Sequence, residues 1–103
     1  MIIQHIPYST ILINQNPSFM YMNTIVLIPA YNEEKTIAEV IAKTKSYVEQ
    51  VVVIDDGSAD ATSLAASEAG AVVLKHKVNL GKGAALKTGC EYALQKGAHK
   101  IVV

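Results

Sequence analysis

The sequence contains no arginine, and its nine lysines are balanced by nine acidic residues. It therefore has neither the net positive charge nor the basic cluster of a nucleic-acid-binding surface, and nucleic acid is not an expected partner. The one cysteine, Cys90, has no second cysteine with which to form an internal disulfide, which fits the reducing cytoplasm. Its apolar helical context predicts a small core residue rather than a reactive thiol.

Residues 1–21 lack both charged side chains and a long unbroken hydrophobic run. A transmembrane helix needs roughly 20 apolar residues in succession, and Pro7 and the polar residues 14–16 interrupt such a span. The segment also lacks the basic start and continuous apolar centre of a signal peptide. We interpret residues 1–21 as a poorly ordered N-terminal extension, such as an upstream start codon would add, with a membrane-facing segment as the alternative.

Residues 22–103 follow a regular alternation of short apolar runs and segments of helical spacing, with no repeat and no low-complexity segment. The alternation predicts right-handed parallel crossovers and a three-layer α/β sheet, a half-domain truncated in its fourth strand. The predicted strands are residues 24–28, 50–55, 71–74 and 100–103, and the predicted helices are residues 33–48, 58–70 and 84–97. The helical residues predicted to face the core are Ile37, Val40, Ile41, Thr44, Val48, Leu64, Ala65, Ala85, Leu86, Cys90, Ala93 and Leu94.

Two adjacent acids, Asp55 and Asp56, follow the most apolar of these strands. Ligands of open α/β sheets bind at the carboxyl ends of the strands, so the pair stands where a small molecule is expected. A carboxylate there can accept a charge-assisted hydrogen bond from a base N–H or a ribose hydroxyl. Alternatively, Asp55 caps the following turn, in which Gly57 supplies an unusual backbone angle. We favour ligand binding for Asp56 and leave both interpretations open for Asp55.

The segment after the first strand, residues 29–33, also reaches this edge of the sheet. Pro29 fixes the exit of the strand, Tyr31 offers a flat ring with a hydroxyl, and Glu33 lies near the expected start of a helix. The segment is consistent with an ordinary strand-to-helix turn and equally with a wall for a nucleobase. In the second interpretation, Glu33 accepts hydrogen bonds from the base.

A third segment, residues 79–83, places two glycines around Lys82 at the start of a predicted helix. Backbone N–H groups and a cation at a helix N-terminus favour phosphate, although a flexible turn explains the composition as well. The segment is not a P-loop, because His76 and Gly83 stand where that motif needs a glycine and a serine or threonine. Leu86 stands at the third glycine of a dinucleotide fingerprint, so that motif is absent too.

Taken together, the segments 28–33, 53–62 and 79–83 resemble the family-2 glycosyltransferases of GT-A fold. Within that family the sequence is most similar to dolichyl- or polyprenyl-phosphate mannose or glucose synthases, and the resemblance covers nearly all of residues 24–103. It implies that these segments contribute to a nucleotide-sugar pocket, in which Asp56 bonds the base with Ile54 beside it and Lys82 lies near the nucleotide or its phosphates. The implied binding residues are Pro29, Ala30, Tyr31, Glu33, Ile54, Asp55, Asp56 and Lys82.

The resemblance further implies a nucleoside-diphosphate sugar donor, UDP-glucose or GDP-mannose, and a polyprenyl phosphate or other glycan as the acceptor. The family holds Mg²⁺ or Mn²⁺ with an Asp-x-Asp motif after the fourth strand, and the sequence contains no such motif. The catalytic base of the family also comes later, so we predict no catalytic residue and no bound metal here. Without a metal and a base, sugar transfer by this sequence alone is expected to be negligible.

Two other classes stay open at this point: a receiver-like signalling domain, which also places acids at strand ends, and a non-catalytic interaction module. A short sheet ending at Val103 would leave apolar surface uncovered, which predicts self-association. For localisation we expect the cytoplasm, at the cytoplasmic face of the membrane in the full-length family.

Overall fold

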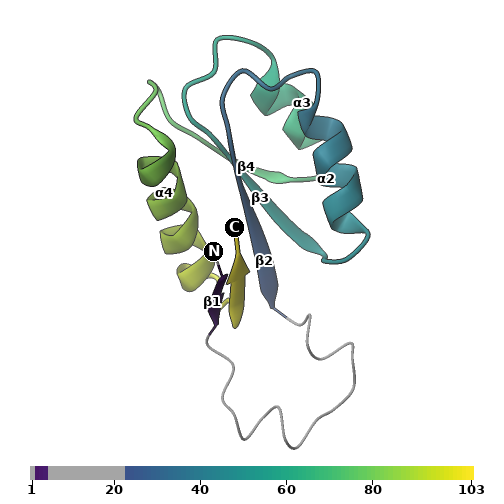
Figure 1. Ribbon diagram of the computed structural model, residues 1–103, viewed down its shortest axis with the longest axis vertical. Coiled ribbons are helices and arrows are strands. Elements are labelled where there is room, and N and C mark those ends of the chain that lie inside the picture. Colours follow the sequence, from purple (N-terminus) through teal and green to yellow (C-terminus); the bar gives the residue numbers. More distant parts are fainter. Residues whose placement is uncertain (1, 5–22) are drawn as a thin grey trace, which may run out of the picture.

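The computed structural model describes residues 2–4 and 23–103, and the rest of the predicted N-terminal extension lies outside the described residues. Figure 1 shows a sheet between helices. In chain order the elements are β1 (Ile2–Gln4), β2 (Thr24–Ala30), α2 (Ile37–Lys45), β3 (Gln50–Asp55), α3 (Thr62–Glu68), β4 (Val72–Lys75), α4 (Lys82–Gln95) and β5 (Lys100–Val102).

The strands form one sheet in the order β1-β5-β2-β3-β4, in which β5, β2, β3 and β4 are mutually parallel. The predicted three-layer α/β architecture with a parallel sheet is thereby confirmed. Counted along the chain, the parallel strands lie in the order third, second, first, fourth, as in doubly wound nucleotide-binding folds. Receiver domains instead place their first strand between the second and the third. The alternative of a receiver-like signalling domain is therefore wrong.

Strand β1 is the part of the sheet that the sequence did not predict. Its three residues pair antiparallel with β5, with Ile3 opposite Ile101. For these three residues the structure differs from the poorly ordered extension that we expected. In the part of the chain that the structure describes, no helix is both long and apolar enough to cross a membrane.

The two faces of the sheet are covered by different helices (Figure 1). Alternate residues of a strand point to opposite faces, so Leu27 and Ile54 pack beneath α4, whereas Val53 packs beneath α2 and α3. Helix α4 lies close to the sheet because Gly89 has no side chain: a Cβ there would stand 2.8 Å from Cδ1 of Ile54. The chain thus changes face between β4 and β5, and a crevice is expected at the carboxyl ends of the strands where the strand order reverses.

Three large apolar side chains that we predicted to face the core are exposed instead: Val40 by 43%, Leu64 by 61% and Leu94 by 54%. The buried helical positions follow strict four-residue steps of mostly small residues. Small residues let a helix approach the sheet closely, and the larger neighbours are then turned to the outside. The buried sets are Ile37 and Ile41 in α2, Thr62 and Ala66 in α3, and Ala85, Gly89 and Ala93 in α4.

Candidate functional site

An open cavity of about 730 Å³ lies at the carboxyl ends of β2 and β3, beside the start of α4. This is the position predicted by the reversal of strand order. Six of the eight predicted binding residues line it: Pro29, Ala30, Tyr31, Glu33, Asp56 and Lys82. Asn79 and Gly81, which belong to the segment 79–83 marked as a candidate phosphate loop, line it as well. The other lining residues are Ala85, Leu86 and Val103, to which sequence reasoning assigned no binding role.

Ile54 and Asp55, the other two predicted binding residues, do not border the cavity and are completely buried. Ile54 belongs to the core beneath α4. The carboxylate of Asp55 accepts hydrogen bonds from the backbone N–H of Ser58, at 2.8 Å, and from the Ser63 hydroxyl. The turn-capping interpretation therefore describes Asp55, and the prediction of direct ligand contact is corrected for both residues.

The environment of Asp55 also affects its ionisation. Burial raises the pKa of this carboxyl, but the hydrogen bonds from Ser58 and Ser63 lower it. The positive charge of Lys75, whose Nζ lies 4.0 Å from Oδ2 of Asp55, lowers it further. The net effect holds the pKa of Asp55 below its usual value, so the carboxylate is charged in the folded protein at neutral pH.

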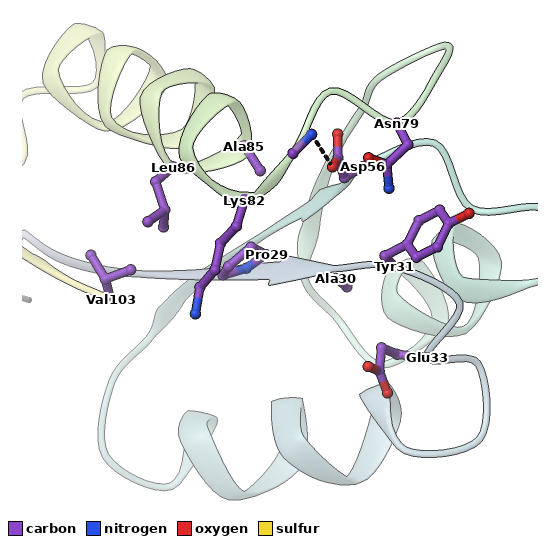
Figure 2. Close-up of a pocket in the computed structure, with 11 residues that line it drawn as sticks. Pro29, Ala30, Tyr31, Glu33, Asp56, Asn79, Lys82, Ala85, Leu86 and Val103 are labelled. Atoms are coloured by element: carbon purple, nitrogen blue, oxygen red, sulfur yellow. Dashed lines mark hydrogen bonds between the residues drawn. The ribbon is translucent and has the colours of Figure 1, made fainter.

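Asp56 has the opposite role, because its carboxylate faces the cavity and fastens the glycine-containing loop. Its Oδ1 accepts hydrogen bonds from the Leu80 N–H at 2.9 Å and from Nδ1 of His76 at 2.8 Å. Its Oδ2 accepts one from the Gly81 N–H at 2.8 Å, which is the dashed line in Figure 2. The hydrogen bonds from Leu80 and His76 lower the pKa of Asp56 more than burial raises it. Asp56 is therefore an ionised acceptor at neutral pH.

His76 is a residue of the site that sequence reasoning missed. Because an ionised Asp56 cannot donate, Nδ1 of His76 carries the proton of their hydrogen bond. In the neutral ring Nε2 is then an acceptor, and it accepts a hydrogen bond from the Thr88 hydroxyl at 2.8 Å. His76 thus joins β3, β4 and α4. The available signal was a polar ring directly after a strand, at the same edge of the sheet as the acid pair.

The loop that carries Tyr31 is held by side chains of the segment after β3. The Ser58 hydroxyl accepts a hydrogen bond from the Asn32 N–H at 2.8 Å, and the Thr62 hydroxyl accepts one from the Glu33 N–H at 2.9 Å. Asn32 adopts a left-handed conformation with φ of 53°, which turns the chain sharply there. These bonds fix the backbone on both sides of the turn. Tyr31 and Glu33 therefore border the cavity from an anchored loop.

Of the two glycines around Lys82, one has a backbone conformation that only glycine adopts easily and the other does not. Alanine substitutions at the two positions therefore form a matched pair of variants. Gly81 has φ of 100° and ψ of 160°, a region open only to glycine. A Cβ at Gly83, in contrast, would meet nothing within 4 Å in the part of the chain that the structure describes. Gly81→Ala is expected to lower the free energy of unfolding by about 1–3 kcal/mol. Gly83→Ala is expected to raise it by roughly 0.5–1 kcal/mol, because alanine favours helix. Urea unfolding measures both free energies. Equal losses of stability in the two variants would show that position 81 does not require glycine more than position 83 does.

Comparison with known families decides what kind of protein carries this site. Residues 25–102 match the model of glycosyl transferase family 2. The chain belongs to this family. The match takes in β2, β3 and β4, the acid pair and the glycine-containing loop, and the family predicted from the three segments is thereby confirmed.

Within the family, this chain is similar to enzymes that are named as sugar transferases. A dolichyl-phosphate beta-glucosyltransferase of Trichomonas vaginalis is 32% identical over 103 residues, which cover 84% of this chain and 30% of that protein. A polyprenol monophosphomannose synthase of Mycolicibacterium smegmatis is 32% identical over 87 residues, covering 77% of this chain and 33% of that protein. The chain therefore spans about a third of the length of these relatives.

A solved structure supports the GT-A fold. Glucosyl-3-phosphoglycerate synthase from Mycobacterium tuberculosis, in complex with Mn²⁺, UDP-glucose and glycerol 3-phosphate, superposes with a TM-score of 0.54 at 36% sequence identity. The superposition covers 61% of this chain and 27% of that protein.

The divalent ion implied by the family does not fit the residues present. Within residues 2–4 and 23–103, no group of three or more His, Cys, Asp or Glu side chains is placed to hold a metal ion. The carboxylates of Asp55 and Asp56 already accept hydrogen bonds from N–H and O–H donors of their own loops. We therefore assign no metal ligand and no metal-dependent step to these residues.

Proposed function

We propose that this chain binds the nucleotide of a nucleoside-diphosphate sugar, UDP-glucose or GDP-mannose, for a glycosyltransferase acting on polyprenyl phosphate or another glycan acceptor. One observation carries the proposal: a single cavity brings together an aromatic ring, an ionised carboxylate and a lysine at a helix N-terminus. Those groups are Tyr31, Asp56 and Lys82. The neighbour from M. tuberculosis, solved with UDP-glucose, supports the choice of ligand class.

Each of the three groups suits a different part of such a ligand. The Tyr31 side chain is 48% exposed at the cavity and offers a flat apolar face to a base. Asp56 can accept a hydrogen bond from a base N–H. Lys82 and the first N–H groups of α4 favour the negative charge of a diphosphate. In Figure 2, Tyr31 and Asn79 lie on one side of Lys82, which fits a base on that side and phosphates near the lysine.

Sugar transfer needs more than this binding site. A base must take the proton of the acceptor hydroxyl, and the charge of the departing diphosphate must be stabilised. The cavity presents Lys82 for part of the second task. We propose that this chain by itself binds the donor without transferring its sugar at a measurable rate.

The contribution of Lys82 tests the proposal. Lys82→Ala is expected to lower the affinity for UDP or GDP by roughly tenfold, because a charge-assisted contact to phosphate is lost. The corresponding nucleoside has no phosphate, so its affinity should hardly change. Lys87→Ala is the matched control, because Lys87 is exposed on the same helix and does not line the cavity. Isothermal titration calorimetry measures each affinity.

Two outcomes would count against the proposal. If the wild-type chain binds neither UDP nor GDP at millimolar concentration, the cavity is not a nucleotide site. If Lys82→Ala weakens nucleoside and nucleoside diphosphate equally, the lysine does not contact the phosphates.

A further inference from the structure

The number of hydrogen bonds already made by Asp56 limits what the cavity can recognise. An ionised carboxylate has about four lone-pair positions, two on each oxygen. On Oδ1 both are used, by the Leu80 N–H at 2.9 Å and by His76 Nδ1 at 2.8 Å. On Oδ2 one is used, by the Gly81 N–H at 2.8 Å. Within residues 2–4 and 23–103, no donor takes the remaining position on Oδ2, which is left for a ligand.

The two candidate bases make different demands on a carboxylate. Guanine presents N1–H and an N2–H side by side, and a carboxylate binds both when each of its oxygens has a free lone pair. Uracil presents a single donor, N3–H, between two carbonyl groups. The single free position on Asp56 matches uracil, whereas guanine would have one donor left unpaired against this carboxylate.

Resting on the proposed function, we infer that the cavity selects uracil over guanine, and that His76 enforces the choice by occupying Oδ1 of Asp56. His76 is thus a positioning residue that acts through Asp56. It is only 12% exposed in its side chain and is held from behind by the Thr88 hydroxyl, so its ring cannot swing aside without losing a second hydrogen bond. The preferred donor is therefore a uridine diphosphate sugar.

Two other polar side chains of the cavity bear on the choice. Glu33 is the second carboxylate that lines the cavity, and in the view of Figure 2 it lies on the other side of strand β2 from Asp56. The inference takes Asp56, and not Glu33, as the carboxylate that meets the donors of the base. Asn79 lies beside Asp56 in the same view, and its amide can donate to a carbonyl of uracil.

The wild-type chain tests the inference without any substitution. Calorimetric titration is expected to give UDP an affinity roughly tenfold to a hundredfold higher than that of GDP, because one hydrogen-bond donor of guanine would be left unpaired in the cavity. GDP binding as tightly as UDP, or more tightly, overturns the inference and leaves the proposed function standing. Failure of both nucleotides to bind overturns the proposed function and the inference with it.

The role of His76 is tested by the ratio of the two affinities. His76→Leu removes the donor and frees a lone pair on Oδ1, so the preference for UDP should shrink to less than about fivefold. His76→Gln keeps an N–H donor and should keep the preference. If His76 had a merely structural role, His76→Leu would lower the affinities for both nucleotides by the same factor and leave their ratio at the wild-type value. That result would overturn the role of His76 in selecting the base.

Discussion

Gly57→Ala is expected to lower the free energy of unfolding by roughly 2–5 kcal/mol and to abolish nucleotide binding. Gly57 has φ of 80°, where an L side chain is strained. A Cβ at this position would also stand 2.4 Å from the carbonyl carbon of Val78 and 2.5 Å from the backbone nitrogen of Asn79. Those atoms belong to backbone, which cannot rotate aside as a side chain can.

The clash reaches the cavity because the displaced backbone is the glycine-containing loop. Moving Val78 and Asn79 pulls the following N–H groups of Leu80 and Gly81 away from the Asp56 carboxylate. Asp56 would then lose two of its three hydrogen bonds, and Lys82 would move with the loop. Stability and nucleotide affinity should therefore fall together.

Gly97→Ala is the matched control for this prediction. Gly97 has φ of 74°, so alanine there brings similar backbone strain, but its Cβ would meet no atom of the described residues within 4 Å. We expect a loss of about 1–2 kcal/mol and an unchanged affinity for UDP. Urea unfolding and calorimetry measure both quantities. Equal behaviour of the two variants would show that close approach to the loop is not what position 57 requires.

The sequence was sufficient for the parallel sheet because its strands are unusually apolar. The run that ends in Asp55 forms β3 with the predicted bounds, residues 50–55. It was also sufficient to bring Tyr31, Asp56 and Lys82 to one cavity, since loops that follow parallel strands meet at one edge. The order of strands and helices along the chain was thus enough to predict that these three residues lie close together.

The different roles of Asp55 and Asp56 were only partly read from the sequence, which left turn capping and ligand binding both open for Asp55. Successive strand residues point to opposite faces, so Asp55 continues the face of Val51 and Val53, beneath α2 and α3. There it meets Ser63 of α3. Asp56 turns toward α4 and its loop. The two-residue alternation of a strand is therefore enough by itself to assign the two acids to opposite faces.

Other features depend on contacts that no local pattern encodes. The predicted start of α2 at Glu33 is too early, because the Glu33 carbonyl accepts from the N–H groups of Thr36 and Ile37 in a turn that precedes the regular helix. The N–H groups of Glu33 and Glu34 are bound by the side chains of Thr62 and Asp60, which lie far away in the sequence. The regular helix begins at Ile37. His76 likewise gains its role only when three separate elements are packed together. Long-range hydrogen bonds of this kind override local preference.

Asp55→Ala is expected to lower the free energy of unfolding by about 3 kcal/mol, because the Ser58 N–H and the Ser63 hydroxyl lose a buried charged acceptor. Asp55→Asn keeps an acceptor for Ser58 and should cost less, about 1 kcal/mol. Glu68→Gln is the matched control, since Glu68 is an exposed acid in the last turn of α3. It should change stability by less than about 0.5 kcal/mol.

The pH dependence of stability separates the structural role of Asp55 from a direct role in binding. Its folded-state pKa lies below the usual value of 3.8, so its charged form stabilises the fold above that pH. This stability is lost as the pH falls below 3.8 through the lowered pKa. Asp55→Asn, which cannot ionise, should flatten that part of the acid limb in urea unfolding measured from about pH 6 downward. At about pH 7, where the wild-type carboxylate is charged, the folded variant should keep its affinity for UDP. A variant with unchanged stability and acid limb but lost UDP binding would instead make Asp55 a ligand-binding residue.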